Sequence, residues 1–542
     1  MKADLTRKSF DPTKHFSRVL MQQGRVQLDA DWNEQAAILL HTMRSLAAYA
    51  FPSGGGSGFG ITPLDSKPLA QDDFALAPGD YWVGGVLCEL ESTPVSVVAL
   101  NADQQQITVA AWTVDEIPFR KGQYVLLTGD TSSSTPPATT TLTAKISALD
   151  YPNTTLTLDT SFPAKLKTAK NLRVQRLVTY KSQPDLPQPP PLPVGSYQIY
   201  LDVWERLITY VEDDSIREVA LNGPDTAART RVVWQIRALP YQPPAEQQNT
   251  PGVAANTPCL TVPALQSMLG PANVGRLRAR TQPGQVSSDP CTISPDSSYR
   301  GPENQLYRVE VHNGNSSDST QQVTFKWSRE NGAVVFPITS IASVNGVPNV
   351  TLANLGRDDR FSLHTGDMVE IQDDSSVLSN TVGPLLQVQS INSGSMTILL
   401  SGTFSGSVGS DPTLHPLVRR WDQVAGDPAQ GGLQLAANSN AAILVADTWL
   451  NLEDGVQVQF PGAASATFRT GDYWLIPARV ATGDVVWPQE SGLDAQGNTV
   501  INPVAQLPDG VMHFYAPLAI VAVADGKAPG VTLCQTPRLA NG

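Results

Sequence analysis

The chain has 542 residues, a net charge of −13 and 16% charged residues, against about 25% charged residues in an ordinary soluble domain. Its acidic balance and the absence of a Lys and Arg cluster argue against nucleic acid as a partner. No apolar run is long enough for a membrane-spanning segment. The 43 prolines favour strands and turns over long helices, in about three or four domains.

The N-terminal region starts with a predicted hairpin. Residues 18–21 and 25–29 have the composition of two short strands, and Gln22-Gln23-Gly24 between them is typical of a turn. We therefore expect a β-hairpin at residues 18–29.

A single amphipathic helix is predicted after this hairpin. Asp31 is its expected N-cap, and Glu34 follows three residues later, as in a capping box. The helix should end before Phe51 and the glycine-rich run 53–60. Apolar residues at spacings of three and four predict one stripe along it, formed by Trp32, Ala36, Leu39, Met43, Leu46 and Ala50.

The rest of the chain has the pattern of strands joined by turns. The proline-dense segment 181–194 is predicted to be an extended connector. Residues 240–305 are expected to be irregular, with one short helix near Val262–Leu269. Strands are predicted within 74–91, 107–114, 123–128, 197–210, 231–238, 306–311, 322–327 and 333–338.

An internal repeat links two distant parts of the chain. Segments 122–130, 144–150, 156–162 and 172–177 resemble, in order, segments 366–374, 386–392, 398–404 and 417–421. Two small all-β modules of one design would explain this order. The alternative is that any two strand-rich stretches look alike.

These patterns predict a mainly β, multi-domain fold, with small β-barrel or sandwich modules behind an N-terminal hairpin and one α-helix. The expected segments are 1–60 for docking, 61–180 with the first barrel-like module, 181–194 as linker, 195–345 with a long irregular loop, 346–422 as a repeat of 115–180, and 423–542 as the C-terminal β domain.

Motifs for catalysis are missing from the sequence. It contains no H-E-x-x-H, no G-x-S-x-G and no phosphate-binding glycine loop, so we expect no enzyme, no cofactor and no metal site. The acidic runs 212–214 and 358–359 are expected to be solvated turns, with a calcium loop as the alternative. Trp82 and Trp474 are expected in the core, although exposed rings could stack on sugars.

The four cysteines are far apart and do not form a disulfide scaffold. We expect them to be isolated small hydrophobic residues. The alternative is a disulfide between Cys259 and Cys291, which bracket one loop-rich stretch.

One polar cluster is the strongest candidate for partner binding. It surrounds a single tryptophan at the start of the predicted helix, where it could form a capped, salt-bridged helix start or a docking element for a larger assembly. The candidate docking residues are Arg18, Arg25, Asp29, Asp31, Trp32, Asn33, Glu34 and Gln35.

This region also resembles a known family. FDPTKHFSRVLMQQGRVQLDADWNEQ (10–35) is similar to the N-terminal signature of a bacterial family associated with phage-tail-like particles and extracellular contractile injection systems. The resemblance continues in segments 202–236, 303–314, 324–335, 468–488 and 513–521.

The resemblance implies a structural component of such a particle, at the baseplate or its periphery, as a wedge, cage or fibre adaptor. The implied partners are other baseplate or tail subunits and further copies of the chain. Assembly would take place in the bacterial cytoplasm, and release would place the particle outside the cell. A surface carbohydrate- or receptor-binding protein and a carboxylate-dependent glycan hydrolase stay open as alternatives.

Overall fold

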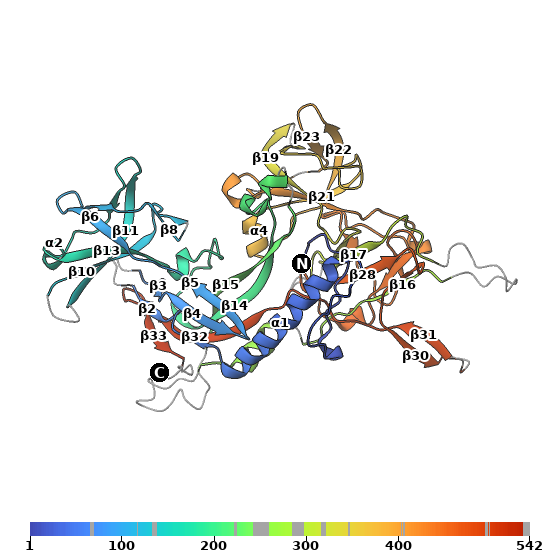
Figure 1. Cartoon of the computed structure of the whole chain (residues 1–542), viewed down its shortest axis with the longest axis horizontal. Helices are drawn as coiled ribbons and strands as arrows, with labels where there is room; N and C mark the ends of the chain where they lie inside the picture. Colours follow the sequence, from blue (N-terminus) through green and yellow to red (C-terminus); the bar gives the residue numbers. More distant parts are fainter. Residues whose placement is uncertain are drawn as a thin grey trace. The chain divides into compact units, whose positions relative to one another are not determined.

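Figure 1 shows the fold of the chain in a computed structural model. The chain is mainly β and multi-domain, as predicted. It divides into two compact units, each built from separated segments. Unit 1 contains residues 1–42, 205–231 and 270–512, and unit 2 contains residues 43–204, 232–269 and 513–542. The structure describes residues 1–64, 70–115, 117–132, 138–221, 225–241, 259–270, 272–283, 298–315, 321–344, 347–402, 404, 407–493, 497 and 499–534.

Unit 2 contains a closed antiparallel barrel, which we call barrel 1. Its interior is formed by alternate side chains of each strand, among them Val125, Leu127 and Val174. Around the barrel the strands follow the order β10-β11-β12-β7-β6-β13. Their bounds are β6 (Val95–Asn101), β7 (Gln106–Val109), β10 (Tyr124–Asp130), β11 (Thr139–Asp150), β12 (Thr155–Leu158) and β13 (Lys170–Leu177).

Unit 1 contains a second closed barrel, barrel 2, with the order β19-β20-β23-β22-β21-β24. When β6 is matched with β19 and the other strands follow in chain order, the two barrels have the same connectivity. The predicted repeat is therefore confirmed as two modules of one design. The strands are β19 (Val335–Val344), β20 (Val347–Leu352), β21 (Met368–Gln372), β22 (Leu386–Asn392), β23 (Thr397–Leu400) and β24 (Leu417–Trp421).

The remainder of unit 2 is built on two sheets, with the orders β1-β4-β5 and β15-β14-β32-β33, and on the strand pair β2-β3. A tight turn at Gly84-Gly85, both with positive φ, joins β4 to β5. The strands are β1 (Gly55–Gly56), β2 (Ile61–Pro63), β3 (Phe74–Leu76), β4 (Gly79–Val83), β5 (Val86–Leu90), β14 (Gly195–Ile208), β15 (Arg229–Pro240), β32 (Phe514–Val523) and β33 (Gly530–Leu533). Between the strands of barrel 1, the sequence also contains a short helix, α2 (Ala164–Lys167), and a short strand pair formed by β8 (Thr113–Val114) and β9 (Ile117–Pro118).

The proline-dense segment 181–194 is packed along the edge of β15. The Gln183 side chain accepts the N–H of Ile236 (2.6 Å) and donates to the Ile236 carbonyl (3.0 Å). The side-chain amide of Gln235 donates to the Asp185 carbonyl at 2.5 Å. A segment rich in proline cannot continue a ladder of backbone hydrogen bonds, so the Gln183 side chain satisfies the Ile236 backbone of the edge strand in its place. Gln235 of that strand satisfies a carbonyl of the proline-dense segment in turn.

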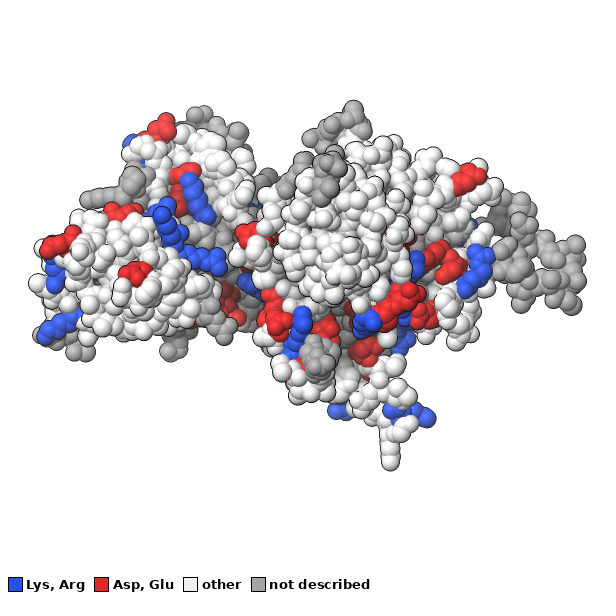
Figure 2. All heavy atoms as spheres, turned by 90° about the horizontal axis from the view of Figure 1, so that it is seen from above, with Lys and Arg blue, Asp and Glu red and all other residues white. Residues whose placement is uncertain are grey.

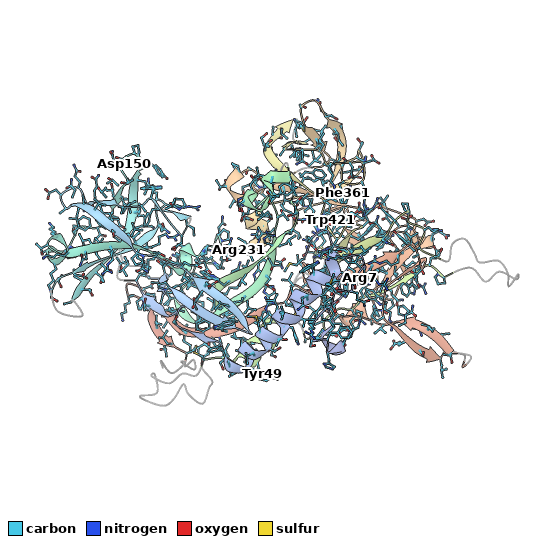
Figure 3. The ribbon with its side chains drawn as sticks, viewed as in Figure 1. Arg7, Tyr49, Asp150, Arg231, Phe361 and Trp421 are labelled. Carbon is cyan, nitrogen blue, oxygen red and sulfur yellow. A yellow bond between two sulfur atoms is a disulfide. The ribbon has the colours of Figure 1, made fainter. Side chains whose placement is uncertain are left out.

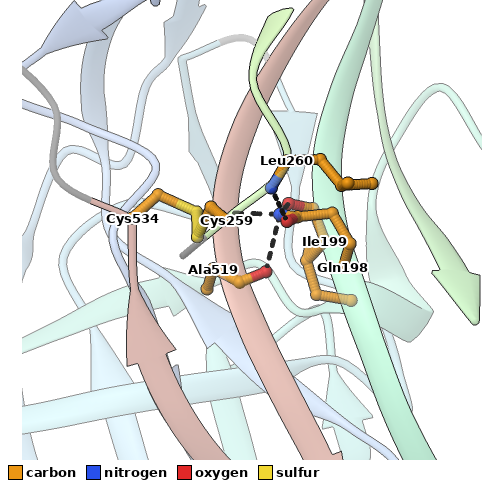
Figure 4. Close-up of a disulfide and its surroundings, with 6 residues drawn as sticks. All are labelled: Gln198, Ile199, Cys259, Leu260, Ala519 and Cys534. Carbon is orange, nitrogen blue, oxygen red and sulfur yellow. Dashed lines mark hydrogen bonds between the residues drawn. A yellow bond between two sulfur atoms is a disulfide. The ribbon is translucent and has the colours of Figure 1, made fainter. Parts of the chain in front are cut away.

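A disulfide closes unit 2 near its C-terminal strand (Figure 4). Cys259 bonds to Cys534, so the expectation that the cysteines are isolated is wrong for these two. The alternative of a Cys259–Cys291 pair is wrong as well, and Cys291 itself lies outside the described residues. Cys88 is a buried free thiol, as expected for a small hydrophobic residue. The disulfide joins the segment before α3 (Val262–Leu269) to the end of β33, which are 275 residues apart. Sequence spacing could not reveal this pair, because the fold alone brings its partners together.

The predicted short helix at Val262–Leu269 is confirmed as α3. Beside it, Gln198 supports an irregularity in the pairing of β14 with β32. Its side-chain amide donates to the carbonyls of Ile199 (2.9 Å) and Ala519 (3.1 Å), and its carbonyl oxygen accepts the Leu260 N–H at 2.9 Å (Figure 4). All of these polar groups are therefore satisfied in a buried site.

The remainder of unit 1 is built on two sheets, with the orders β16-β27-β26 and β25-β18-β17-β28-β29, and on the strand pair β30-β31. The short helix α4 (Asp374–Leu378) begins with a capping box at Asp373 and Ser376. The strands are β16 (Arg278–Thr281), β17 (Gln305–Val311), β18 (Thr324–Ser328), β25 (Ala442–Ile443), β26 (Leu450–Asn451), β27 (Val456–Gln459), β28 (Tyr473–Arg479), β29 (Asp484–Val485), β30 (Gln489–Leu493) and β31 (Thr499–Pro503).

Candidate functional site: the N-terminal docking segment

The predicted helix is confirmed as α1, but its start differs from the prediction. It spans Asp29–Ala50 and ends before Phe51, as expected. Asp31 lies within the first turn, so it is not the N-cap, and the capping box with Glu34 is wrong. The carboxylate of Asp29 instead accepts hydrogen bonds from the Thr6 N–H (3.0 Å) and hydroxyl (2.5 Å). Thr6, far back in the chain, thus holds the side chain of the first residue of α1 through a tertiary contact rather than a cap.

The predicted hairpin at residues 18–29 is wrong. A turn is present at residues 23–24, where Gly24 has a φ of +71° and the Arg25 N–H donates to the Gln22 carbonyl at 3.4 Å. The residues on both sides of it form no strand with any described part of the chain. We call residues 15–28 the docking loop. The strand-like composition on both sides of this turn misled the prediction, because a two-stranded hairpin needs further packing to be stable.

Residues 1–9 hold the docking loop to unit 1. The Lys2 ammonium lies 3.0 Å from a carboxylate oxygen of Glu310, and the Asn331 amide donates to the carbonyls of Met1 (3.0 Å) and Ala3 (2.8 Å). Further along, the Lys8 ammonium pairs with Asp509 at 2.9 Å. These contacts fix the position from which the docking loop leaves the body of unit 1.

The contact of Lys2 belongs to a buried charge cluster formed by Lys2, Arg308, Glu310, Lys326 and Glu370. The Arg308 guanidinium lies 2.6 Å from Glu310, and Lys326 lies 3.5 Å from Glu310 and 2.6 Å from Glu370. Burial raises the pKa of Glu310, but the charges of Lys2, Arg308 and Lys326 outweigh burial and hold that pKa well below its ordinary value. The indole N–H of Trp421, labelled in Figure 3, donates to Glu370 at 3.0 Å.

The far side of the docking loop is tied to α1. The side-chain oxygen of Gln35 accepts the Val19 N–H at 2.8 Å, and the Ser9 hydroxyl donates to the Ala30 carbonyl at 3.3 Å. The Phe10 ring packs on His41, with 5.6 Å between the ring centroids. The docking loop is therefore held at both ends while its side chains face solvent.

The candidate docking residues separate into two groups. Asp29 and Gln35 hold the segment together through the contacts above, and Asp31 and Glu34 are half-buried on α1. The other four, Arg18, Arg25, Trp32 and Asn33, are exposed. Within the described residues, neither Arg18 nor Arg25 forms an ion pair. Only this second group is available to a partner.

The sequence analysis missed the apolar part of this surface. Five large hydrophobic side chains of the docking loop are between 41% and 83% exposed, namely Phe16, Leu20, Met21, Val26 and Leu28. Of 28 such exposed residues in the described chain, 11 lie between Phe16 and Tyr49. Contiguous exposed apolar surface is typical of an interaction site. The signal was present as apolar residues in a polar stretch, but it was interpreted as the inner face of a hairpin.

The other sequence candidates have structural roles. Glu212 accepts the Thr209 N–H (2.8 Å) and hydroxyl (2.6 Å), and Asp213 caps the turn that follows. Asp358 likewise accepts the Phe361 N–H at 2.9 Å. Among the described residues, no group of three or more His, Cys, Asp or Glu side chains could hold a metal ion. Nor does any helix of the described chain have the length and hydrophobicity needed to cross a membrane.

A cleft of about 590 Å³ lies in unit 2. Three of the charged side chains that line it, Asp72, Asp73 and Lys181, contact one another or the backbone. Lys181 pairs with Asp72 at 2.6 Å, and Asp73 accepts the N–H groups of Phe74 (3.0 Å) and Lys181 (3.1 Å). These contacts stabilise the cleft wall and leave the N-terminal surface as the better candidate.

The family comparison covers most of the chain. Residues 1–110, 192–250 and 245–534 match DUF6519, which is described as a family of unknown function. A search of curated proteins found no match. The family match omits residues 111–191, which hold most of barrel 1, but it includes the docking loop, α1 and barrel 2. Because the matched segments cover more than half of its length, the chain belongs to the DUF6519 family.

Proposed function

We propose that the chain is a structural component of a contractile phage-tail-like particle, at the baseplate or its periphery. In this role the docking loop, which carries Arg18 and Arg25, binds a neighbouring subunit, and Trp32 and Asn33 at the start of α1 belong to the same N-terminal contact surface. The particle class is inferred from the resemblance of residues 10–35 to the signature described above. The docking role is inferred from the chemistry of the surface.

The observation that carries this proposal is the exposure of five large hydrophobic side chains on a loop fixed at both ends. Burying such side chains at an interface contributes about 25 cal/mol for each Å² of apolar surface removed from water. A loop already held by Lys2, Lys8 and Gln35 loses less conformational entropy on binding than a free one. Preorganised apolar surface of this kind suits a stable assembly contact.

The low charge of the rest of the surface agrees with this role. Figure 2 shows one face of the chain, on which broad areas carry neither acidic nor basic side chains. Charged residues are depleted in the cores of protein interfaces. A subunit with several neighbours would use such areas as contacts.

The two tryptophans on which the carbohydrate-binding alternative depends are both covered, fully or in part. Trp474 is buried in the core of unit 1, and its indole N–H donates to the Gln506 carbonyl at 3.0 Å. Trp82 is half-buried, and its ring stacks on Phe51 with 6.3 Å between the centroids. Neither ring forms an open platform for a sugar.

The test is the sedimentation of a native lysate, with mass spectrometry across the gradient. We expect the unchanged chain to travel with sheath and tube proteins in a megadalton band. The double variant Leu20→Asp/Val26→Asp should stay at the top, because charges would be buried at the interface. Val424→Asp, at an exposed site elsewhere in unit 1, is the matched control and should enter the band.

Two results would contradict the proposal. If the unchanged chain stays at the top of the gradient, the particle assignment fails. If the double variant sediments as the control does, the docking loop is not the contact. Deleting residues 1–50 would be a poorer test, because the loss of Lys2 would leave Glu310 with one cation fewer in a buried site.

A further inference from the structure

The apolar stripe of α1 faces solvent. We call Trp32, Ala36, Leu39, Met43, Leu46 and Ala50 the α1 seam. Its four large side chains are between 55% and 72% exposed, and both alanines are exposed as well. The predicted spacing is therefore confirmed, but the stripe does not cover the protein core. Residues 29–42 of α1 are counted with unit 1 and residues 43–50 with unit 2. Because α1 is one continuous helix, the spacing of the seam residues along it is that of the helix itself.

The packed face of α1 has few large apolar side chains. Ala30 and Ile38 are buried, while Asp31, Glu34, Arg44 and several small residues are half-buried. A surface helix normally turns its large apolar residues inward and its polar face outward. In α1 the large apolar residues of the seam lie on the exposed face instead, which indicates that a partner outside the described chain covers the seam.

The spacing of the seam indicates what kind of partner fits. Its residues are separated by steps of 4, 3, 4, 3 and 4, which is the repeat of the a and d positions of a coiled coil. A stripe restricted to these positions is the narrow seam of a helix pair rather than the wider face of a core helix. From Trp32 to Ala50 it runs for about 27 Å at 1.5 Å per residue. The fitting partner is therefore another α-helix.

The order of large and small residues identifies that helix. When two copies of α1 are placed antiparallel and centred between Leu39 and Met43, Trp32 faces Ala50 of the other copy, Ala36 faces Leu46, and Leu39 faces Met43. The outer layers then each combine one large side chain with one alanine, and the central layers each pair a leucine with a methionine. In a parallel pair each residue would face itself, so two alanine layers would leave voids beside an overfilled tryptophan layer.

The charges beside the seam permit this pairing. The flanking e and g positions of a coiled coil usually carry the charges that select or reject a partner. In α1 these positions are all uncharged, so two copies meet no like-charge repulsion. They are Asn33, Gln35, Leu40, Thr42, Ala47 and Tyr49. Tyr49, labelled in Figure 3 near the end of α1, is among the most exposed side chains of the described chain.

We infer that the chain forms a two-fold symmetric dimer in which the α1 seams of two copies pack as an antiparallel helix pair. The inference rests on the proposed function only in treating the N-terminal region as an assembly surface. It assigns α1, with Trp32 and Asn33, to a second copy of this chain, while the docking loop with Arg18 and Arg25 remains free for a different subunit. A two-fold contact of this kind is isologous, so a single self-complementary surface is sufficient.

The first experiment measures the mass of the purified full chain by light scattering after gel filtration and by sedimentation equilibrium. We expect a monomer–dimer equilibrium. Leu39→Asp/Met43→Glu should weaken dimerisation by at least tenfold, and Val424→Asp should leave it unchanged. Both seam residues are exposed in the single chain, so circular dichroism of the variant should match that of the unchanged chain. A monomer at every concentration, or a dimer that the seam variant leaves intact, would overturn the inference.

The second experiment tests the orientation of the pair by cysteine cross-linking. A chain with Ala36→Cys is mixed with a tagged chain with Leu46→Cys under mild oxidation, beside the unchanged chain as the control for its own cysteines. The antiparallel pair predicts a cross-link between the two different variants and little from either alone. Self-cross-linking of Leu46→Cys without the other variant would indicate a parallel pair and overturn the inference. This experiment needs no loss of stability, so it decides the question even where the charged variant fails to fold.

These results remain separate from the particle test. If the purified chain is monomeric but still sediments with a particle, the dimer is wrong and the proposed function stands. If the chain dimerises through the seam but stays at the top of the lysate gradient, the dimer stands and the particle assignment is wrong.

Discussion

Barrel 1 and barrel 2 have the same strand order but different surroundings. In barrel 1, β10 and β13 alternate between buried and partly exposed residues, as in a module whose outer side reaches solvent. In barrel 2, every residue of β24 and four of the five residues of β21 are buried. The second barrel is therefore covered on the outside of these two strands, where the β18 residue Lys326 contacts Glu370.

Equivalent positions of the two barrels show how the different surroundings are reflected in the residue types. The pairing of Val125 with Arg176 corresponds to that of Val369 with Arg420. The inward-facing residues keep their character in this match, since aliphatic Val125, Leu127 and Val174 correspond to Val369, Ile371 and Val418. On the same face, buried Arg176 corresponds to buried Arg420. The outward-facing residues do not keep their character, because half-buried Leu126, Gln175 and Leu177 in barrel 1 correspond to buried Glu370, Arg419 and Trp421 in barrel 2.

This comparison separates the requirement of the barrel from the requirement of its neighbours. The interior needs apolar side chains in both modules, because they fill the same closed space. The exterior depends on what packs against it. The family match covers barrel 2 and omits most of barrel 1, which agrees with barrel 2 being part of the body of its unit and barrel 1 being an addition.

The largest loss in the free energy of unfolding is expected from removing the charge of Lys326, which contacts barrel 2 from the neighbouring sheet of unit 1. Lys326→Met leaves the buried Glu370 with only the Trp421 indole as partner and should cost about 3–5 kcal/mol. Arg173→Met in barrel 1 is the control, because its pair with Asp130 at 3.5 Å is half-exposed and should contribute under about 1 kcal/mol. Urea unfolding, with hydrogen exchange of the β10 and β21 amides, measures both.

A double variant sharpens this test. In Lys326→Met/Glu370→Leu both charges are gone, so much of the lost stability should return. If Lys326→Met costs no more than Arg173→Met, the buried charges do not hold barrel 2 in place and the comparison fails.

The second expected effect concerns stability, which should depend on pH in unit 1 but not in barrel 1. Burial, together with the charge of Lys326, lowers the pKa of His312 to about 4. Its unfolded pKa is about 6.5, so the unfolded chain binds a proton that the folded chain rejects. Stability is therefore lost as the pH falls from about 6.5 to 4, by at most about 1.4 kcal/mol per pH unit.

His312→Gln should remove this slope from urea titrations between these pH values. Glu453 acts in the opposite sense, because burial raises its pKa to about 7 and stability is lost as the pH rises toward that value. Glu453→Gln is therefore the companion variant. Residues 95–177 contain no histidine, so an equal slope in barrel 1 amides would contradict the assignment.

The smallest change in stability is expected when Leu126 of barrel 1 is replaced by the residue type found at the equivalent position of barrel 2, Glu370. Leu126→Glu puts a carboxylate at a half-buried outward position that water reaches, so the free energy of unfolding should change by under about 1 kcal/mol. The measurement is the urea midpoint followed by hydrogen exchange of β10. A loss near that of Lys326→Met would show that the outside of barrel 1 is covered as well.

The repeat was predictable because it lies in local patterns. Alternation along each strand and the order of the segments predicted two modules of one design, and both barrels have that design. The end of α1 before Phe51 and the helix α3 were predictable for the same reason, since caps, breakers and periodicity act within a few residues.

The candidate site was only partly predictable. Trp32, Arg18 and Arg25 were identified and are exposed, whereas Asp29 and Gln35 turned out to hold the segment together. The docking loop was predicted as a hairpin because strand-like composition on both sides of a turn predicts two strands whether or not the rest of the fold lets them pair.

The sequence by itself determined the local periods, namely the helix, the alternating strands, the repeat and the heptad spacing of the α1 seam. The tertiary structure alone decided which face of each element is covered, that Cys259 meets Cys534, and that Glu370 is buried beside Lys326. Periodicity reports the geometry of one element, because neighbouring residues set its backbone. Burial and pairing depend on groups that lie tens to hundreds of residues away, and folding alone brings them together.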